Sequence, residues 1–377
     1  SKNLADVVLI DVAEGLPQGK ALDMMHMRSV EQFTVKVIGT NDYADTRDSD
    51  VVVITAGIAR KPGMTREDLL GVNAGIMKSV IGQAMEASPN AVFICVTNPL
   101  DVMTTLAFRE SGLPANRLMG MGGVLDSSRL AFAVCEQLGC APADVTAWAV
   151  GAHGEGMVCW PRFTTVDGTP ITELMDEAAV ASVVQRCVKG GAEVVAFLKT
   201  GSAYYAPGAS IAKMVEAILT DSHEVMSVCA HIDGQYGIED LYMNVPVRLG
   251  KNGVEEVVEF DLNDDELAAL RASADSVRAG LANLPICETG EGAAQNFPHA
   301  QRLLPYGLLL SLPVERVGVG CDSADRGSVA WAALPVVKGG VALPLGRKGS
   351  ACWSRSTRGT VSGAGAAWTI AWARTLR

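Results

Sequence analysis

The stretch DVVVITAGIARKPGMTREDLLGVNAGIMKSVIGQAMEASPNAVFICV, residues 50–96, contains the pattern that decides the fold. Two short apolar runs rich in Val and Ile, DVVVITA (50–56) and AVFICV (91–96), flank the helix-length segment 67–88. Strands that are apolar at nearly every position are typical of parallel sheets with both faces covered. The stretch therefore predicts a strand, a crossover helix and a parallel strand.

The same alternation extends in both directions along the chain. VVLID, VKVIGT and LMGM predict further strands, and LPQGKALDMMHM and SSRLAFAVCEQLG predict helices between and after them. This order predicts an α/β fold with a doubly wound parallel sheet. Because ligands bind such sheets beyond the carboxyl ends of the strands, functional side chains are expected in the loops that follow them.

The pattern changes after Ala141. Helices are expected near 176–199 and 206–220, strands at YMNVPVRLG and GVEEVVEF, and a last helix over DDELAALRASADSVRAGLANL, which Asn263 would cap. A mixture of this kind predicts a second, α+β domain.

Residues 285–377 fit neither pattern. They are rich in Gly, Ser and Arg, their apolar residues follow no period, and no acidic residue comes after Asp325. We expect this tail to be poorly ordered. The domains expected are therefore 1–122, 123–284 and the atypical tail.

Composition excludes several classes of function. The formal charge of −11 argues against general binding of nucleic acid or of an anionic membrane, because both need basic surfaces. No apolar run is long enough to span a membrane, and Asp6 and Asp11 interrupt the apolar residues of the first segment. The nine cysteines show no metal-binding spacing, so we expect reduced thiols, no metal site and a cytoplasmic location.

Five polar side chains stand at or just after predicted strands. Asp11 ends the first strand, Asn98 follows the strand 91–96, and His153 lies in the Gly-flanked loop GAHGEG. Asp126 and Arg129 are three residues apart and so project from one face of a helix start. Taken singly, each has an ordinary alternative, such as a helix cap for Asn98 or a surface salt bridge for Asp126 and Arg129.

A strand-terminal carboxylate such as Asp11 suits the adenosine ribose of NAD, but the usual partner motif is not found. A glycine-rich phosphate loop belongs about 20 residues upstream, which falls before Ser1. We therefore expect a first βαβ unit without its first strand, and a sheet with an unpaired internal edge.

The motifs LIDVAEGLPQGKALD, TAGIARKPGMTRED, VTNPLDVMT, GVLDSSR, GAHGEGMV and KTGSAYYAPGAS occur in an order and at a spacing that resemble the lactate/malate dehydrogenase family. The closest resemblance is to its lactate-dehydrogenase-like malate dehydrogenases, and it covers about residues 1–283. It implies a Rossmann-type NAD-binding domain followed by a substrate domain. It also implies NAD as cofactor, a small dicarboxylate as substrate, and a homodimer or homotetramer with helices near 15–29 and 205–220 in the contacts.

The resemblance also implies roles for single residues. His153 would be the general acid and base, and Asp126 would orient its imidazole. Arg60 on a closing loop would select malate through its second carboxylate, Arg66 would polarise the carbonyl oxygen, and Arg129 would hold the first carboxylate. The implied cofactor contacts are Asp11, Asn73, Val96, Thr97 and Asn98, of which Asn98 would also contact the substrate.

Departures from the family pattern keep alternatives open. Around His153 the family usually has Gly-Gly-His-Gly-Asp and then Met-Val-Pro, whereas this chain has Ala152, Glu155, Gly156 and Cys159-Trp160. We expect reduced activity from these changes rather than a new function. The alternatives are a lactate or other 2-hydroxyacid dehydrogenase, and an inactive truncated subunit that does not bind NAD.

Overall fold

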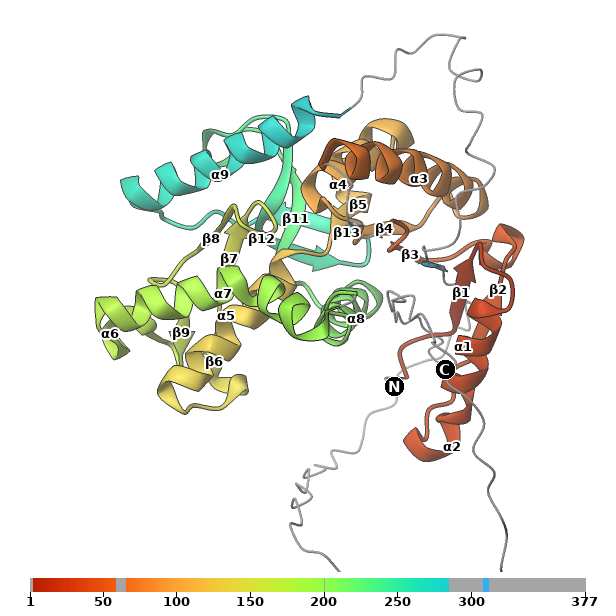
Figure 1. The fold of residues 1–377 in the computed structure, drawn as a ribbon, viewed down its shortest axis with the longest axis horizontal. Coiled ribbons are helices and arrows are strands. Elements are labelled where there is room, and N and C mark those ends of the chain that lie inside the picture. Colours follow the sequence, from red (N-terminus) through yellow and green to blue (C-terminus); the bar gives the residue numbers. More distant parts are fainter. Residues whose placement is uncertain (1–2, 59–65, 200, 285–307, 312–377) are drawn as a thin grey trace, which may run out of the picture. The chain divides into compact units, whose positions relative to one another are not determined.

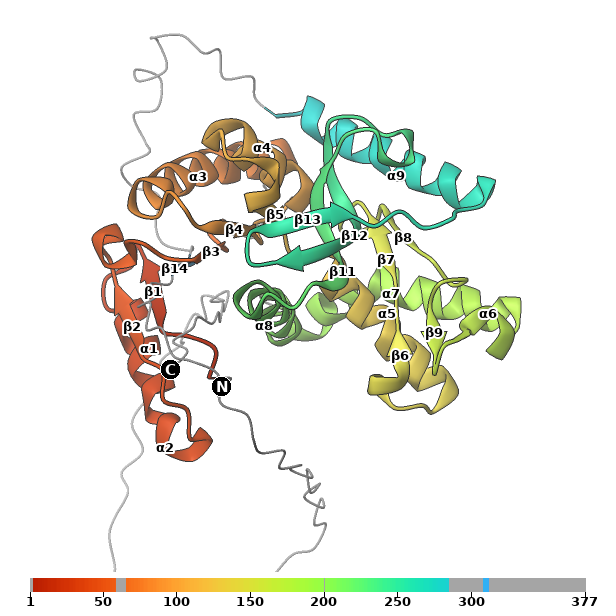
Figure 2. The ribbon, with the colours of Figure 1, turned by 180° about the vertical axis from the view of Figure 1, so that it is seen from behind.

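Eleven strands form one sheet in the computed structural model, which describes residues 3–58, 66–199, 201–284 and 308–311. Figures 1 and 2 show the ribbon from opposite sides. The strands of this sheet are β1 (Val7–Asp11), β2 (Val37–Thr40), β3 (Val51–Ile54), β4 (Val92–Cys95), β5 (Leu118–Gly120), β7 (Ala149–Gly151), β8 (Met157–Cys159), β11 (Glu224–Ile232), β12 (Leu241–Gly250), β13 (Gly253–Val257) and β14 (Leu308–Ser311). A separate three-stranded sheet contains β6 (Val145–Thr146), β9 (Thr165–Val166) and β10 (Thr169–Pro170).

Helices connect and cover these strands. The α-helices are α1 (Leu16–His26), α2 (Arg28–Glu31), α3 (Arg66–Ala87), α4 (Leu100–Ser111), α5 (Gly123–Leu138), α6 (Ile171–Leu174), α7 (Glu177–Leu198), α8 (Tyr205–Thr220) and α9 (Asp264–Ala282). Short 3₁₀ helices lie at Tyr43–Thr46, Ala115–Arg117, Pro142–Asp144 and Gln235–Gly237. None of the helices in the described ranges is long and apolar enough to span a membrane.

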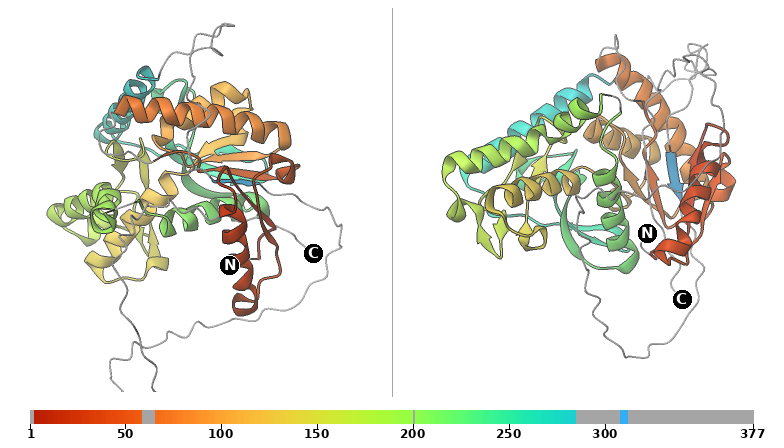
Figure 3. Two further views of the ribbon diagram at one scale, coloured as in Figure 1. Left: turned by 45° about the vertical axis from the view of Figure 1, so that its right-hand side comes forward. Right: turned by 60° about the horizontal axis from the view of Figure 1, so that its bottom comes forward.

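The first half of the sheet has the predicted doubly wound architecture. β1 pairs with β2, β3 with β4 and β4 with β5, all in parallel. Val52 and Ile54 of β3 pack into a core with α3 and α4, while Val51 and Val53 belong to a second core that includes residues of α1 and α8. Figure 3 shows helices on the two faces of this sheet. β3 and β4 are apolar and buried at every position because both of their faces are covered.

One strand corrects the expectation of an unpaired internal edge. β14 lies between β1 and β3 and pairs with both in antiparallel orientation, with Asp11 opposite Leu308 and Ile54 opposite Leu309. The order β2-β1-β14-β3-β4-β5 is the doubly wound order 3-2-1-4-5-6 with β14 at the position of the first strand. A short segment of the region expected to be irregular therefore satisfies the backbone groups that β1 and β3 present to each other.

The second half of the chain extends the same sheet with antiparallel strands. β11 pairs with β5 at Cys229 and Gly120, and β12 then pairs along the whole length of β11. Asn263 caps α9 as predicted, in a reciprocal capping box with Glu266. All described residues fall in one compact unit of the chain, and the predicted domain limits at 122/123 and 284/285 stay predictions.

Candidate functional site

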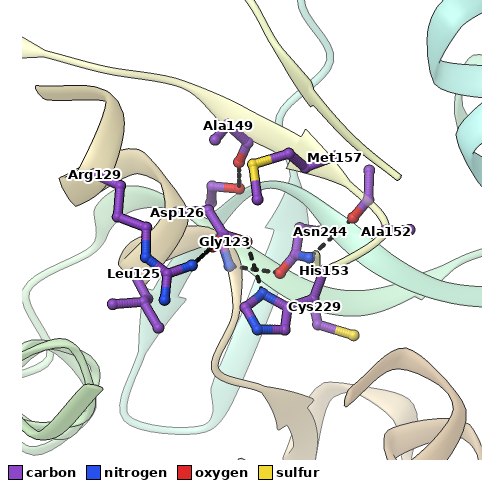
Figure 4. Close-up of polar contacts among 12 residues, drawn as sticks. Gly123, Leu125, Asp126, Arg129, Ala149, Ala152, His153, Met157, Cys229 and Asn244 are labelled. Atoms are coloured by element: carbon purple, nitrogen blue, oxygen red, sulfur yellow. Dashed lines mark hydrogen bonds and ion pairs between the residues drawn. The ribbon is translucent and has the colours of Figure 1, made fainter. Parts of the chain in front are cut away.

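Asp126, in the first turn of α5, joins the two other charged side chains of the site. Its Oδ1 accepts a hydrogen bond from Nη1 of Arg129 at 2.7 Å, and its Oδ2 lies 2.7 Å from Nδ1 of His153 (Figure 4). Only 1% of Asp126 is exposed to solvent. The contact between Asp126 and Arg129 thus joins a half-buried guanidinium to a carboxylate removed from solvent, and is not the surface salt bridge that was its simpler interpretation.

The start of α5 is held against the second half of the sheet. The backbone N–H of Gly123 donates to Oδ1 of Asn244 at 2.6 Å, and Nδ2 of Asn244 donates to the carbonyl of Gly151 at 2.9 Å. A Cβ at Gly123 would overlap the side chain of Ser227, so only glycine permits this approach. One amide side chain of β12 therefore fixes both the helix that carries Asp126 and the strand that leads to His153.

His153 lies in the loop between β7 and β8, and three hydrogen bonds from two helices fix this loop. The N–H of Ala152 donates to Oγ of Ser273 in α9 at 2.8 Å, and the same hydroxyl donates to the carbonyl of Gly156 at 2.6 Å. The N–H of His153 donates to Oδ2 of Asp101 at 2.9 Å. Gly151 has a φ of 81°, a conformation that favours glycine, and turns the chain out of β7.

These contacts set the state of the imidazole. Burial lowers the pKa of His153, but the charge and the hydrogen bond of Asp126, together with the charge of Asp101, outweigh burial and raise the pKa above its ordinary value. Arg129 opposes them with its positive charge. Because an ionised carboxylate only accepts hydrogen bonds, Nδ1 carries the proton toward Asp126, and Nε2 is the nitrogen left to exchange a proton with a bound molecule.

Two of the departures from the family pattern fit each other. Ala152 is buried, and a Cβ placed on Gly156 would lie 3.0 Å from the Cβ of Ala152. Since position 156 carries no side chain, the extra methyl of Ala152 has room in the loop. The loop therefore accommodates Ala152 because Gly156 stands opposite it.

Trp160 anchors the far end of this loop. Its side chain is completely buried, and its ring centroid lies 5.5 Å from that of Phe260 and 5.8 Å from that of Phe163. The backbone N–H of Trp160 also donates to the carbonyl of Trp148 at 2.9 Å. The Cys159-Trp160 departure therefore places a large apolar side chain in the core directly after β8.

A second group of predicted residues lies where β3 and β4 end. Asn73 is buried, and its Oδ1 accepts from the N–H of Ile58 at 2.9 Å while its Nδ2 donates to the carbonyl of Asn98 at 2.8 Å. Thr97 donates through its hydroxyl to the carbonyl of Ala56 at 2.6 Å. Asn73 and Thr97 thus hold the two strand-end loops together.

Asn98 and Val96 lie beside these loops. The side chain of Asn98 is exposed, and α4 has Pro99 at its N-cap and no side-chain capping bond, so Asn98 is not the helix cap that was its simpler interpretation. Val96 is half-buried and its N–H donates to the carbonyl of Ile54 at 2.8 Å. A Cβ at Gly57 would lie 2.8 Å from Cγ2 of Thr97, which shows how closely the β3 exit approaches β4.

Asp11 lies at the carboxyl end of β1, at the same edge of the sheet. Burial raises the pKa of its carboxyl, although the N–H groups of Ala13 and Val12 and the charge of Lys20 partly offset this. Oδ1 accepts from the N–H of Ala13 at 2.8 Å. The carboxyl is therefore preorganised at a strand end.

Two further predicted residues are Arg60 and Arg66. Arg60 lies outside the described residues. Arg66 is the first residue of α3, and its side chain is outside the described part. Their roles stay predictions.

The sequence interpretation did not single out Asp101, Asn244 or Ser273, which orient the site from α4, β12 and α9. Asp101 stands in the quoted motif VTNPLD, so a carboxylate in the first turn of a helix at a strand end was its available signal. Asn244 and Ser273 had none, because a polar residue within an apolar strand or on a helix does not reveal its partner.

One cluster in the described ranges has the composition of a metal site. Asp221, His223 and Glu255 bring one ligand atom each within 4.8 Å of one another at the surface. Nδ1 of His223 lies 2.7 Å from Glu255, and Nζ of Lys251 lies 3.5 Å from Asp221, so the charges are already paired within the protein. The expectation that this chain binds no metal stays a prediction.

Residues 1–120 match the family described as lactate/malate dehydrogenase, NAD binding domain, and residues 123–284 match lactate/malate dehydrogenase, alpha/beta C-terminal domain. Proteins named malate dehydrogenase from Dehalococcoides mccartyi and Synechocystis are each 50% identical, over 76% and 74% of this chain and 93% and 86% of their own length.

Solved structures agree with these matches. Malate dehydrogenase from Salinibacter ruber has 47% identity and a TM-score of 0.70, over 74% of this chain and 88% of that one. Lactate dehydrogenase from Cryptosporidium parvum, solved with lactic acid and nicotinamide adenine dinucleotide, has 44% identity and a TM-score of 0.72, over 75% of this chain and 90% of that one. With the His153–Asp126–Arg129 group in place, these similarities establish that the chain belongs to the lactate/malate dehydrogenase family.

Proposed function

We propose that this protein interconverts (S)-malate and oxaloacetate with NAD. The observation that carries the proposal is the bridge in which Asp126 contacts both the imidazole of His153 and the guanidinium of Arg129. The imidazole of His153 can move a proton near neutral pH, and the guanidinium of Arg129 can bind a carboxylate. A fixed separation between these two groups suits a hydroxy acid, which carries a hydroxyl beside a carboxylate. The named relatives support malate as the substrate.

In the oxidation of malate, Nε2 of His153 takes the proton of the C2 hydroxyl. Asp126 stabilises the imidazolium that forms and keeps the ring in the required tautomer. Arg129 holds the C1 carboxylate, since a guanidinium with five N–H donors retains donors for a second carboxylate after its bond to Asp126. NAD, when bound, accepts the C2 hydride. In the reverse direction His153 returns the proton.

Three further residues complete the proposal. Arg60 pairs with the second carboxylate of malate, and Arg66 stabilises the charge that develops on the carbonyl oxygen. Asn98, exposed at the end of β4, donates to the substrate and accepts from the nicotinamide ribose. Asn73, Val96 and Thr97 support the nicotinamide end by holding the β3 and β4 loops.

The fit of NAD to the described residues is good at its two ends. Asp11 offers a buried carboxylate to the adenosine ribose, and the close approach at Gly57 leaves backbone without side chain at the nicotinamide end. Between these ends, the part of the chain that the structure describes supplies no glycine-rich turn that leads from the first strand position into a helix. That position holds β14, which runs antiparallel to β1.

This placement of β14 favours a second candidate, a subunit that folds and binds a diacid but holds NAD weakly. A parallel first strand would deliver a helix N-terminus and its N–H groups to the pyrophosphate, whereas an antiparallel strand delivers neither. The two candidates differ in one measurable property, the affinity for the dinucleotide.

A homodimer or homotetramer and a cytoplasmic location are also proposed. Large apolar side chains are exposed on α1, α7 and α8, among them Leu22 at 59%, Phe197 at 79% and Tyr205 at 77%, which supports a covered surface in an oligomer. The described cysteines are all free thiols, which supports a reducing compartment.

Titration of the protein with NADH, followed by nucleotide fluorescence, distinguishes the two candidates. The proposed dehydrogenase predicts saturable enhancement that is lost in Asp11→Ala and kept in the nearby surface variant Asp23→Ala. A flat titration at NADH concentrations up to about 1 mM, near the weak end of specific binding, would instead support the subunit that holds NAD weakly.

Substrate choice is tested by Arg60→Gln. Loss of a charge-assisted pair costs about 1.5–3 kcal/mol, so kcat/KM for oxaloacetate should fall roughly 10- to 150-fold while that for pyruvate does not fall. Lys61→Gln, which removes the same charge one residue away, is the matched control and should change neither ratio. If unaltered protein reduces pyruvate faster than oxaloacetate, the malate assignment is wrong and the lactate alternative holds.

Two successive glycines in α7 lie against the side chain of Arg129, but only the first leaves a Cβ too little room. A Cβ at Gly190 would lie 3.2 Å from Cδ of Arg129, while a Cβ at Gly191 would lie 3.5 Å from Nη2, an ordinary contact. Alanine in either place should favour the helix itself by up to about 1 kcal/mol. We therefore expect Gly190→Ala to raise KM for malate several-fold without loss of thermal stability, and Gly191→Ala to leave KM unchanged. Equal KM values in the two variants would show that α7 does not position Arg129.

A further inference from the structure

Asp101 is a buried carboxylate that contacts the backbone of the loop between β7 and β8, which carries His153. It stands in the first turn of α4 and is 6% exposed. Its Oδ2 accepts the backbone N–H of His153 at 2.9 Å, and its Oδ1 lies 3.5 Å from Sγ of Cys229 in β11. It therefore links three segments of the chain at the residue that moves the proton.

We propose that Asp101 is a positioning residue for His153, which fixes the backbone of the loop through its hydrogen bond and stabilises the protonated imidazole through its negative charge. The proposal rests on the proposed function for the role of His153 as acid and base. Asp101 is then a second carboxylate, besides Asp126, that acts on His153. It lies on α4 rather than α5, and it accepts the backbone N–H of His153 rather than contacting the imidazole.

A purely structural role for Asp101 is the competing explanation. An acidic residue in the first turn of a helix stabilises the helix dipole, but an exposed carboxylate would serve that purpose at lower cost. Both oxygens of Asp101 are instead turned toward other segments, and the residue is removed from solvent. The cost of burying the charge of Asp101 is offset if it faces the positive charge of a protonated His153.

The charges that face His153 come from two helices. Asp126 and Arg129 lie on α5 and Asp101 lies on α4, while the thiol of Cys229 on β11 contacts Asp101. Burial raises the pKa of Asp101 to about 6, partly offset by the charge and the N–H of His153. At neutral pH Asp101 is therefore mainly ionised, and its charge adds to that of Asp126 in favour of the imidazolium.

The test is the titration of His153 by NMR in protein without substrate, in Asp101→Asn and in the unaltered protein. The chain contains five histidines, and a His153→Gln variant identifies the signal. Asparagine keeps an oxygen that accepts the N–H of His153 but removes the charge, so the pKa of His153 should fall by about one unit. The pH dependence of malate oxidation should move to lower pH by the same amount.

Asp264→Asn is the matched control, because Asp264 is an exposed acid in the first turn of α9. Asp264→Asn should lower the thermal stability of the protein, because α9 loses a negative charge at its N-terminus. It should leave the pKa of His153 unchanged. An unchanged His153 titration in Asp101→Asn would overturn the proposal and leave a helix-terminal role. The NMR measurement needs no turnover, so a protein that is inactive toward malate can still show that Asp101 shifts the titration of His153. Failure of the proposed function and failure of the Asp101 proposal are therefore distinguishable.

If Asp101→Asn does not fold, the titration of the unaltered protein tests the proposal instead. Two interacting groups titrate as a pair, so the His153 signal should show a second inflection near the pKa of Asp101, and a ¹³C-labelled Asp101 carboxyl should show the same two steps. A single-step curve for His153, with an Asp101 carboxyl that does not respond to the imidazole, would refute the proposal.

Discussion

The site depends on a carboxylate, Asp126, that is excluded from water and bound to two partners. Removal of one partner from a buried charge pair costs about 3–5 kcal/mol, because the remaining charge stays desolvated. The contacts with Arg129 and His153 therefore stabilise the ionised Asp126 as well as orienting the two partners. The separation between a carboxylate-binding guanidinium and a proton-exchanging imidazole is fixed by one side chain, before any substrate arrives.

The rest of the structure maintains this arrangement from several sides. Asn244 joins the start of α5 to the end of β7, Ser273 holds the loop from α9, and Asp101 holds it from α4. Each partner is a side chain that bonds to backbone, so the loop has little freedom although its glycines permit it. At Ala152 and Gly156, the absence of a side chain at one position leaves room for the methyl at the other.

The sequence predicted the parts of this fold that follow from local periodicity. β3 (Val51–Ile54) is apolar throughout because both faces of the sheet are covered there. Asn263 caps α9 because its side chain reaches the third N–H of the helix. The opposite is true of β14, where four residues pair with strands about 250 and 300 positions earlier in the chain. Neither periodicity nor propensity carries information on such a contact.

The catalytic group was predictable in part. Asp126 and Arg129 are helical neighbours, so their contact follows from spacing, whereas the bond between Asp126 and His153 joins residues 27 positions apart and needed the family resemblance. Asp101 and Ser273 act on the loop across 52 and 121 positions, which no local pattern records.

Malate oxidation by Asp126→Asn as a function of pH tests the central role of this carboxylate most directly. Since the folded protein raises the pKa of His153 partly through Asp126, the unprotonated imidazole needed for oxidation should appear at lower pH in the variant. The plateau of kcat should fall by about 100-fold or more, because the orientation of the imidazole and the stabilisation of its protonated form are lost. A variant with the pH profile and kcat of the unaltered protein would contradict the account, because Asp126 would then not hold the acid-base group.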